Sequence, residues 1–260
     1  MSIFVFDIET IPDTQLGRRL LNIEANDRET ADAMLLLQRQ TQGSDFPKHH
    51  LHRIVAISCV FRHRDSLKIW SLGEETSDEK TLIERFFSGI TKFIPTLVSW
   101  NGTGFDLPVL HYRALMHAIP SSVYWETGDF DSNFRWNNYL NRYHTRHIDL
   151  MDTLSAFQPR AFAPLHEMAL ALGLPGKMGM DGREVWNAYQ AGEIQRIRNY
   201  CEIDVINTYL IFLRFEFIRG RLNTEEYLLE QQKLRDHLEN EKHEHFQAFL
   251  KVWNETYRNE

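Results

Sequence analysis

Two acidic residues follow an apolar run close to the N-terminus. The run Ile3-Phe-Val-Phe-Asp7-Ile-Glu9-Thr10 predicts a buried strand whose exit carries both acids. Because side chains alternate along a strand, Asp7 and Glu9 are expected to point to the same side. Neighbouring buried carboxylates repel each other, and a divalent cation is the partner that relieves this repulsion. The alternative is a pair of acids that open a loop and face water.

Two further acids stand at comparable places later in the chain. Asp106 follows a short apolar strand and a turn with two glycines, at or near the start of a helix. Asp204 lies in a long predicted helix, one turn after Tyr200, so that both side chains face the same way. Taken singly, Asp106 is explained as a helix cap and Asp204 as a solvated residue. Their order after the Asp-x-Glu pair favours one site that all four acids share.

The apolar periodicity predicts the elements that position these residues. A hairpin is expected after the first strand, and Asp106 and Asp204 belong to two of the later helices. Residues 120–146 are rich in aromatic and polar side chains and show no clear period. The expected strands cover 3–10, 54–61, 67–72, 97–100 and 147–150, and the expected helices cover parts of 13–52 together with 78–94, 107–118, 151–157, 164–172 and 193–219.

Composition limits the class of protein. With 260 residues, 43% of them hydrophobic and 25% charged, the chain is expected to be globular with one sizeable core. Acids in the first residues argue against a signal peptide, and no apolar run is long enough for a membrane span. Cys59 and Cys201 are interpreted as reduced thiols of a cytoplasmic protein. The net charge of −7 argues against a broad nucleic-acid-coating surface, although not against a nuclease.

The order of the acidic motifs resembles that of the DEDD superfamily of 3′→5′ exonucleases. The likeness rests on Phe6-Asp7-Ile-Glu9-Thr10, Asn101-Gly-Thr-Gly-Phe105-Asp106 and Tyr200-Cys-Glu-Ile-Asp204. Tyr200 indicates the tyrosine (DEDDy) branch, because Asn199 stands where the other branch has a histidine. The chain is similar to the exonuclease domain of family-B DNA polymerases, here without a polymerase. The likeness covers roughly residues 1–215 and leaves the tail outside.

The resemblance implies an α/β fold of the RNase H-like type. The hairpin at 54–72 should run antiparallel to the first strand, the two later strands should run parallel to it, and helices should cover both faces. We expect residues 1–222 to form the exonuclease domain, with a helical insertion at 13–52. Residues 223–260 should form a helical C-terminal extension docked on this domain, and dimerisation through the extension is left open.

The resemblance also implies a two-metal mechanism with two Mg²⁺ or Mn²⁺ ions. Asp7 would bridge both ions, and Glu9 and Asp204 would complete the site that activates the attacking water. Asp106 would hold the second ion near the leaving 3′ oxygen. Tyr200 would orient the attacking water by a hydrogen bond, since an ordinary phenol is a poor base near neutral pH.

Residues that hold the nucleic acid follow from the same resemblance. Thr10 would contact the terminal 3′-OH and Ile11 would wedge beside the last base. Asn101 and Phe105 fall where the family holds the terminal nucleotide, although turn geometry explains Asn101 and core packing explains Phe105 equally simply. Lys177, between two glycines, is a candidate phosphate contact or an uninvolved surface lysine.

The predicted function is metal-dependent hydrolysis of nucleotides from the 3′ end of single-stranded DNA. A 3′→5′ exoribonuclease of the same fold and a non-catalytic nucleic-acid-binding module are the alternatives, and the presence of all four acids speaks against the second. A polymerase or repair partner is left open. The aromatic residues of 124–143 are expected to pack locally, with base stacking as the other interpretation.

Overall fold

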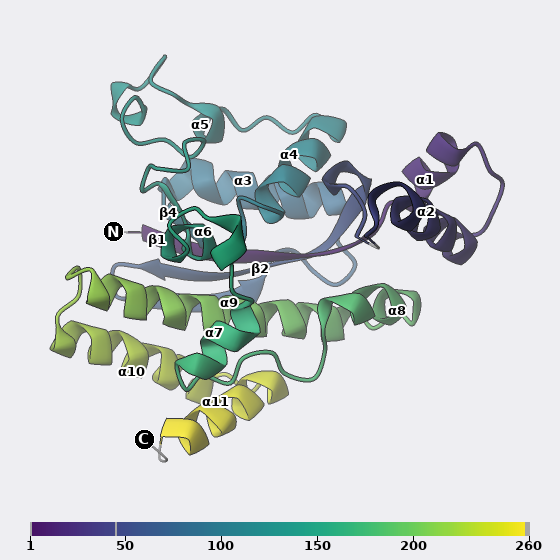
Figure 1. The fold of residues 1–260 in the computed structure, drawn as a ribbon. Coiled ribbons are helices and arrows are strands. Elements are labelled where there is room, and N and C mark those ends of the chain that lie inside the picture. The colour runs from purple at the N-terminus through teal and green to yellow at the C-terminus, as the bar shows by residue number, and fades with distance from the viewer. Residues whose placement is uncertain (1, 45, 258–260) are drawn as a thin grey trace.

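The computed structural model describes residues 2–44 and 46–257. Met1, Asp45 and residues 258–260, which fall within the ranges expected for the two domains and the insertion, lie outside the described residues. A sheet forms the middle of three layers, with α3, α4 and α5 on one face and α7, α9, α10 and α11 on the other (Figure 1). The strands are β1 (Ser2–Pro12), β2 (His52–His63), β3 (Ser66–Ser71), β4 (Thr96–Ser99) and β5 (His147–Asp149).

Helices follow most strands and fill the two outer layers. None of those in the described ranges is long and apolar enough to cross a bilayer. The helices are α1 (Thr14–Leu21), α2 (Asp27–Gln42), α3 (Glu79–Phe93), α4 (Asp106–Met116), α5 (Ser122–Trp125), α6 (Leu150–Leu154), α7 (Leu165–Ala171), α8 (Val185–Gln190), α9 (Ile194–Ile218), α10 (Thr224–Asn240) and α11 (Glu244–Tyr257), with 3₁₀ turns η1 (His49–Leu51), η2 (Ser132–Phe134), η3 (Pro159–Ala161) and η4 (Gly182–Glu184).

The sheet is mixed, with the strand order β3-β2-β1-β4-β5. The β2–β3 hairpin pairs antiparallel to β1, whereas β4 and β5 are parallel to β1. This arrangement confirms the RNase H-like α/β class that the motif order implied. Parallel neighbours need crossover helices, which α3 supplies before β4 and α4 supplies before β5.

The first strand is longer than expected. It pairs with β2 from Ser2 to Pro12, whereas its pairing with β4 extends only from Ile3 to Val5. Asp7 and Glu9 therefore lie inside β1 rather than at its exit, which corrects the expectation from the sequence. The acids do not end the strand because β2 continues beside them, and a bulge occurs only between Glu9 and Thr10.

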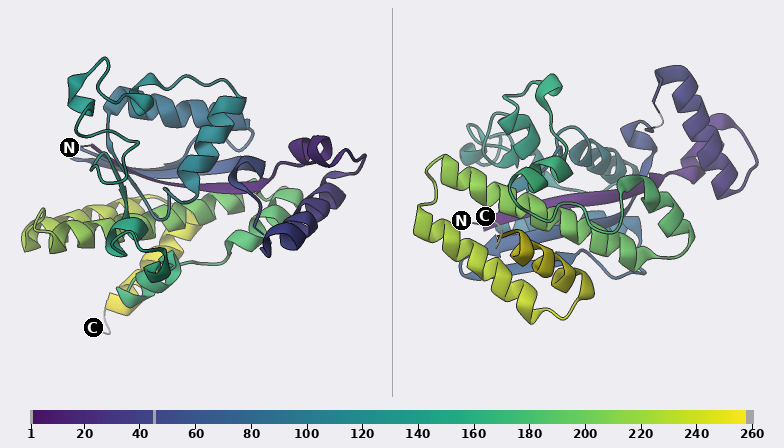
Figure 2. Two further views of the ribbon diagram at one scale, coloured as in Figure 1. Left: turned by 45° about the horizontal axis from the view of Figure 1, so that its top comes forward. Right: turned by 60° about the horizontal axis from the view of Figure 1, so that its bottom comes forward.

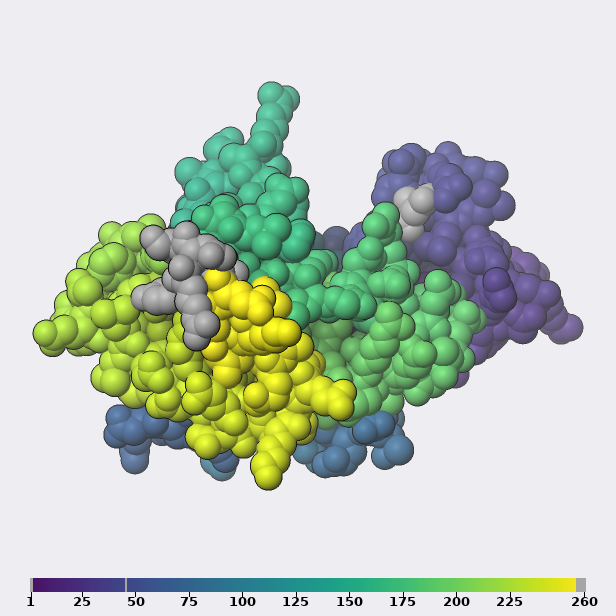
Figure 3. Space-filling view, turned by 90° about the horizontal axis from the view of Figure 1, so that it is seen from below, coloured from purple at the N-terminus to yellow at the C-terminus, as the bar shows by residue number. Residues whose placement is uncertain are grey.

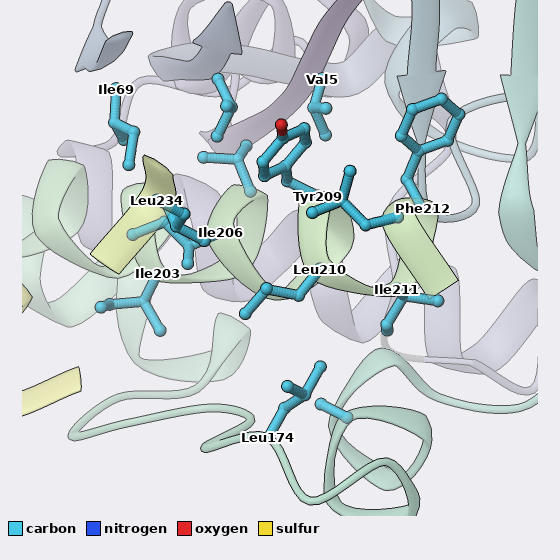
Figure 4. Close-up of a cluster of buried hydrophobic side chains, with 14 of the residues drawn as sticks. Val5, Ile69, Leu174, Ile203, Ile206, Tyr209, Leu210, Ile211, Phe212 and Leu234 are labelled. Carbon is cyan, nitrogen blue, oxygen red and sulfur yellow. The ribbon is translucent and has the colours of Figure 1, made fainter. Parts of the chain in front are cut away.

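Alternation along β1 divides the apolar side chains between two cores. Phe4, Phe6 and Ile8 face α3 and α4, whereas Val5 faces α9 (Figure 4). Asp7 and Glu9 continue the series of Val5, so their side chains are directed to the α9 side of the sheet.

Helix α9 is apolar around most of its circumference because it is covered on most sides. The sheet lies on one side of α9, and α7, α10 and α11 pack on the others (Figure 2). Leu234, Phe246 and Trp253 of α10 and α11 belong to the same buried cluster as the middle of α9. The C-terminal helices are thus docked on the sheet domain, as the sequence predicted for this tail, and α11 lies on the molecular surface (Figure 3).

Two segments flank this framework. Helices α1 and α2 project beyond the end of the sheet at which β1 leaves it (Figure 1), so the expected helical character of 13–52 is confirmed, while its status as an insertion stays a prediction. In segment 120–146, which showed no clear period in the sequence, some aromatic side chains are buried and others are exposed. Tyr124, Phe134 and Tyr139 are buried, whereas Phe130 and Trp136 are 97% and 82% exposed.

Candidate active site

The two acids of β1 are neighbours on the face that α9 covers. Glu9 is buried and Asp7 is partly buried. One carboxylate oxygen of each residue and the Sγ atom of Cys201 lie within 4.8 Å of one another. Strand alternation explains the pair, since residues two apart on a strand share a face.

Asp106 approaches Asp7 and Glu9 from α4, which packs on the opposite face of the sheet. It is the first residue of α4, and Phe105 occupies the N-cap position, so the alternative of an N-cap role for Asp106 is wrong. Its Oδ1 atom accepts the backbone N–H of Ile8 at 3.1 Å. Because β4 pairs with β1 only as far as Val5, the Ile8 N–H has no strand partner there, and the Asp106 carboxylate takes that place.

The turn before Asp106 is held by Asp149. Asp149 caps α6, and it also accepts the backbone N–H groups of Asn101 at 2.9 Å and Thr103 at 2.8 Å. Asn101 adopts a left-handed conformation with φ of 66°. Asn101 therefore shapes the turn, which is the alternative that the sequence left open for it. No sequence signal marks the second role of Asp149, because it depends on the pairing of β4 with β5.

Helix α9 supplies the remaining two residues. Tyr200 and Asp204 are 4% and 6% exposed and share a side-chain hydrogen bond, as expected for residues one helical turn apart. The Oδ1 atom of Asp204 is buried and has no hydrogen-bond partner. A buried carboxylate oxygen without a partner costs free energy, so this atom is suited to a ligand.

Burial raises the pKa of all four acids, and the charges of other cluster acids raise those of Asp7 and Glu9 further. Burial raises the pKa of Asp7 well above its usual value, and the charges of the three other acids raise it further. Burial also raises the pKa of Asp106 to about 7 and that of Asp204 to about 6. For Glu9, burial and the charge of Asp204 raise the pKa. Four crowded carboxylates with hard oxygen donors are the ligand set that Mg²⁺ and Mn²⁺ prefer, so the residues present fit such ions.

Lys177 lies beside this cluster. Its Nζ atom is 5.4 Å from the centre of the Tyr200 ring, and its charge partly offsets the rise in the pKa of Glu9 and Asp204. The loop is held in place by side chains that sequence reasoning missed. Asn207 accepts the N–H of Gly176 at 3.1 Å and donates to its carbonyl at 2.9 Å, and His166 Nδ1 accepts the N–H of Lys177 at 3.1 Å. An asparagine within the apolar run of α9 was the available signal.

A cavity of about 660 Å³ opens next to Glu9. It brings together four residues predicted to contact substrate, namely Thr10, Ile11, Phe105 and Lys177, whereas Asn101 is not part of its lining. Sequence reasoning missed the other walls, which include Leu35, Phe46, His52, Arg183 and Trp186. Among these, His52 Nδ1 lies 2.8 Å from Thr10 Oγ1, so the threonine hydroxyl is already engaged.

An α/β fold with a mixed sheet, an acid-bearing first strand and a buried acid cluster defines an RNase H-like exonuclease domain. The sequence matches the family model "Predicted 3'-5' exonuclease related to the exonuclease domain of PolB" over residues 44–253. The protein belongs to this family. The match includes α10 and most of α11, beyond the expected limit near residue 215, but it begins at residue 44, whereas the likeness was expected to begin at residue 1.

Known DNA polymerases contain related segments. A DNA polymerase of Archaeoglobus fulgidus is 29% identical over 139 residues, which are 52% of this chain and 17% of the polymerase. The catalytic subunit of DNA polymerase epsilon from Emericella nidulans is 27% identical over 143 residues, which are 53% of this chain and 6% of the polymerase chain. Its counterpart from Saccharomyces cerevisiae is 24% identical over 144 residues, again 6% of its length. The chain thus spans a small part of each of these relatives.

Proposed function

We propose that this protein hydrolyses phosphodiester bonds from the 3′ end of single-stranded DNA with the aid of two divalent cations. The observation that carries the proposal is the buried cluster of Asp7, Glu9, Asp106 and Asp204, in which Asp204 Oδ1 lacks a hydrogen-bond partner. A cluster of this kind costs folding free energy without a cation, which makes a purely structural role a poor explanation.

The four carboxylates would hold two Mg²⁺ or Mn²⁺ ions, with Asp7 central because the charges of the three other acids all act on it. Such cations stabilise the charge that develops on a phosphate and lower the pKa of water. The chain's own contribution is to keep the ligands close together. The hydrogen bond from Ile8 N–H holds Asp106, and the packing of α9 on β1 holds Asp204.

Tyr200 orients the attacking water in this proposal and does not act as a base. Burial and the neighbouring acids raise the pKa of its phenol far above neutral pH. The hydroxyl therefore stays protonated and serves as a hydrogen-bond partner beside Asp204.

The cavity next to Glu9 would receive the 3′-terminal nucleotide. Phe46, Phe105 and Trp186 offer aromatic walls for an unpaired base, and such stacking is typical of single-strand recognition. Lys177 brings positive charge to the same cavity and would contact phosphate, whereas Arg183 is paired there with Asp181 at 2.9 Å. Ile11, which is almost fully buried, would supply a rigid apolar wall.

DNA is proposed as the substrate because the relatives are DNA polymerases. The same relationship favours 3′ ends that a polymerase leaves behind as the natural substrate, and a polymerase as the partner.

The test uses 5′-labelled single-stranded DNA and RNA of equal sequence with Mg²⁺ or Mn²⁺. We expect a ladder that shortens from the 3′ end of DNA, and no ladder with EDTA or with Asp7→Ala. Shortening of RNA in preference to DNA would replace the proposed substrate by the exoribonuclease alternative. Intact DNA and RNA with both metals would contradict the enzymatic proposal.

A further inference from the structure

A buried row of polar side chains starts at the acid cluster and leads away from it. The Sγ atom of Cys201 lies 3.4 Å from the carbonyl oxygen of Asp7 and 3.5 Å from its Oδ2 atom, and donates to both. Ser58 on β2 is the cross-strand neighbour of Asp7 in the β1–β2 pair. The Oγ atom of Ser58 lies 2.8 Å from that of Ser71 on β3.

The row continues to the C-terminal helix. Ser71 Oγ donates to Glu202 Oε1 at 2.6 Å, and His245 Nε2 lies 2.7 Å from Glu202 Oε2. Glu202 thus has a hydrogen-bond partner on each of its carboxylate oxygens, and His245 is the partner that comes from α11. We call Asp7, Cys201, Ser58, Ser71, Glu202 and His245 the polar row.

Burying the polar row costs free energy, and apolar residues of similar size would fill the same space without that cost. Ser58 is fully buried, and Ser71 and Glu202 are 4% and 7% exposed. A buried network of this kind rigidifies its surroundings when every member is satisfied. It also helps to fix the position of α9 against the sheet, because hydrogen bonds are directional and apolar contacts are not.

Glu202 has a special position in this network. It lies on α9 directly after Cys201 and two residues before Asp204, and it faces away from the acids toward β3 and α11. Arg198, one turn earlier, donates to the carbonyl oxygens of Ser71 and Gly73 at 3.2 and 2.9 Å. Both contacts tie α9 to the end of β3, and so they fix the rotation at which the helix presents Asp204.

We propose that His245 is a positioning residue of the active site, which acts through Glu202 and the polar row on the carboxylate of Asp7 and on the rotation of α9. This inference rests on the proposed function. It assigns the C-terminal helix α11 a part in cation binding although α11 contributes no residue to the acid cluster.

The proposal predicts an effect on cation affinity and kcat but not on substrate binding. No residue of the polar row lines the cavity proposed for the 3′ nucleotide. Loss of the His245–Glu202 bond should therefore weaken Mn²⁺ binding and lower kcat, each by about fivefold to tenfold, which is the size of the net contribution of one hydrogen bond. KM for the DNA strand should stay within twofold.

Four variants separate positioning from simple docking of α11. His245→Leu removes the donor, whereas His245→Gln retains one and should restore most of the affinity and of kcat. Ser71→Ala interrupts the row on β3 without touching α11. Lys251→Ala, at an exposed position of α11, is the matched control and should behave as the wild type. Mn²⁺ affinity is measured by electron paramagnetic resonance on metal-free protein, and kcat and KM on a labelled strand.

The double variant Ser71→Ala/His245→Leu provides the decisive comparison. If both residues act through one row, the double variant should lose little more Mn²⁺ affinity than the worse single variant. Multiplicative losses, or wild-type affinity in His245→Leu, would overturn the proposal. So would an equal loss in Lys251→Ala. Mn²⁺ affinity does not depend on nuclease activity, so an inactive wild type would contradict the proposed function, whereas normal affinity in the variants would contradict this inference.

Discussion

At the scale of residues, the acid cluster favours cation binding but destabilises the metal-free fold. The charges of three other acids act on Asp7, whose carboxylate has little access to water. Such a site is unfavourable for the folded state without a counter-ion and favourable for binding one. The side chain whose loss relieves the most repulsion should therefore also be the one whose loss removes the most activity.

Asp7→Asn tests whether the side chain that destabilises the metal-free fold is also the one that activity requires. In EDTA at pH 8 the free energy of unfolding should rise by about 1–2 kcal/mol, because one buried charge disappears without a change of shape. Nuclease activity should fall by roughly a thousandfold or more, because loss of a central ligand removes the cations. Thermal melting with and without Mn²⁺ checks the first effect, and the variant should lose the rise in melting temperature that Mn²⁺ causes in the wild type. Asp32→Asn, at an exposed position on α2, serves as control. A less stable Asp7→Asn in EDTA would contradict the argument.

Tyr200→Phe tests the contribution of the Tyr200 hydroxyl alone. The variant keeps the ring that packs beside Lys177 and loses only the hydroxyl that bonds to Asp204. We expect kcat to fall by about a hundredfold, as for other oriented hydrogen-bond donors. KM should stay within threefold, and steady-state kinetics on a labelled strand distinguish the two. A change confined to KM would assign Tyr200 to substrate binding instead.

At the scale of elements, the loop that carries Lys177 depends on contacts from two helices. Asn207 of α9 and His166 of α7 hold the backbone at Gly176 and Lys177. Gly176 has φ of +67°, and a Cβ atom there would lie 2.5 Å from His166 Nδ1. Gly179 has a similar φ of +72°, but a Cβ atom would meet nothing within 4 Å. The two glycines therefore form a matched pair.

Gly176→Ala should move the loop, whereas Gly179→Ala should not. Both variants carry the backbone strain of alanine at positive φ, about 1 kcal/mol each. Only Gly176→Ala adds the clash with His166, which displaces Lys177 from the acids. We expect kcat/KM for the DNA strand to fall about tenfold in Gly176→Ala and to change less than twofold in Gly179→Ala. Equal losses in the two variants would show that strain alone is responsible.

At the scale of the molecule, the acid cluster should make stability depend on pH. In the metal-free fold the pKa of Asp106 is about 7, and those of Asp7 and Glu9 are also raised, whereas an unfolded aspartate has a pKa near 3.8. The folded state therefore binds more protons near neutral pH, and the free energy of unfolding falls as pH rises. Buried histidines act in the opposite direction only at lower pH, since burial lowers the pKa of His147 to about 4.

The prediction is a melting temperature in EDTA that falls between pH 7 and 8.5. An unfolded histidine, with a pKa near 6.5, is mostly neutral over this range, and burial keeps His52, His111 and His147 neutral in the fold, so the acids dominate. A loss of about 2 kcal/mol corresponds to roughly 4–8 °C for a chain of this size. Saturating Mn²⁺ should remove most of the decline, because the cations replace the protons, and Asp106→Asn should reduce it without metal. A constant or rising melting temperature in EDTA would contradict the proposed crowding of ionised acids.

Much of the fold and of the acid cluster could be predicted from local patterns. Apolar runs rich in aromatic and β-branched residues predicted the first strand and the hairpin, and the 3.6-residue period predicted α3 and α9. The same periods predicted that Asp7 and Glu9 share one face and that Tyr200 and Asp204 share another. Side chains two residues apart on a strand, or four residues apart on a helix, point the same way. These relations depend only on backbone geometry over a few residues.

Tertiary structure decided the contacts that complete the site. The continuation of β1 past its acids depends on β2, the hydrogen bond from Ile8 to Asp106 joins residues 98 positions apart, and Asp149 reaches the turn at Asn101 only because β5 pairs with β4. The polar row from Asp7 to His245 likewise joins three strands and two helices. No local period records such contacts, since they arise when distant backbone groups that lack a partner meet in the packed chain.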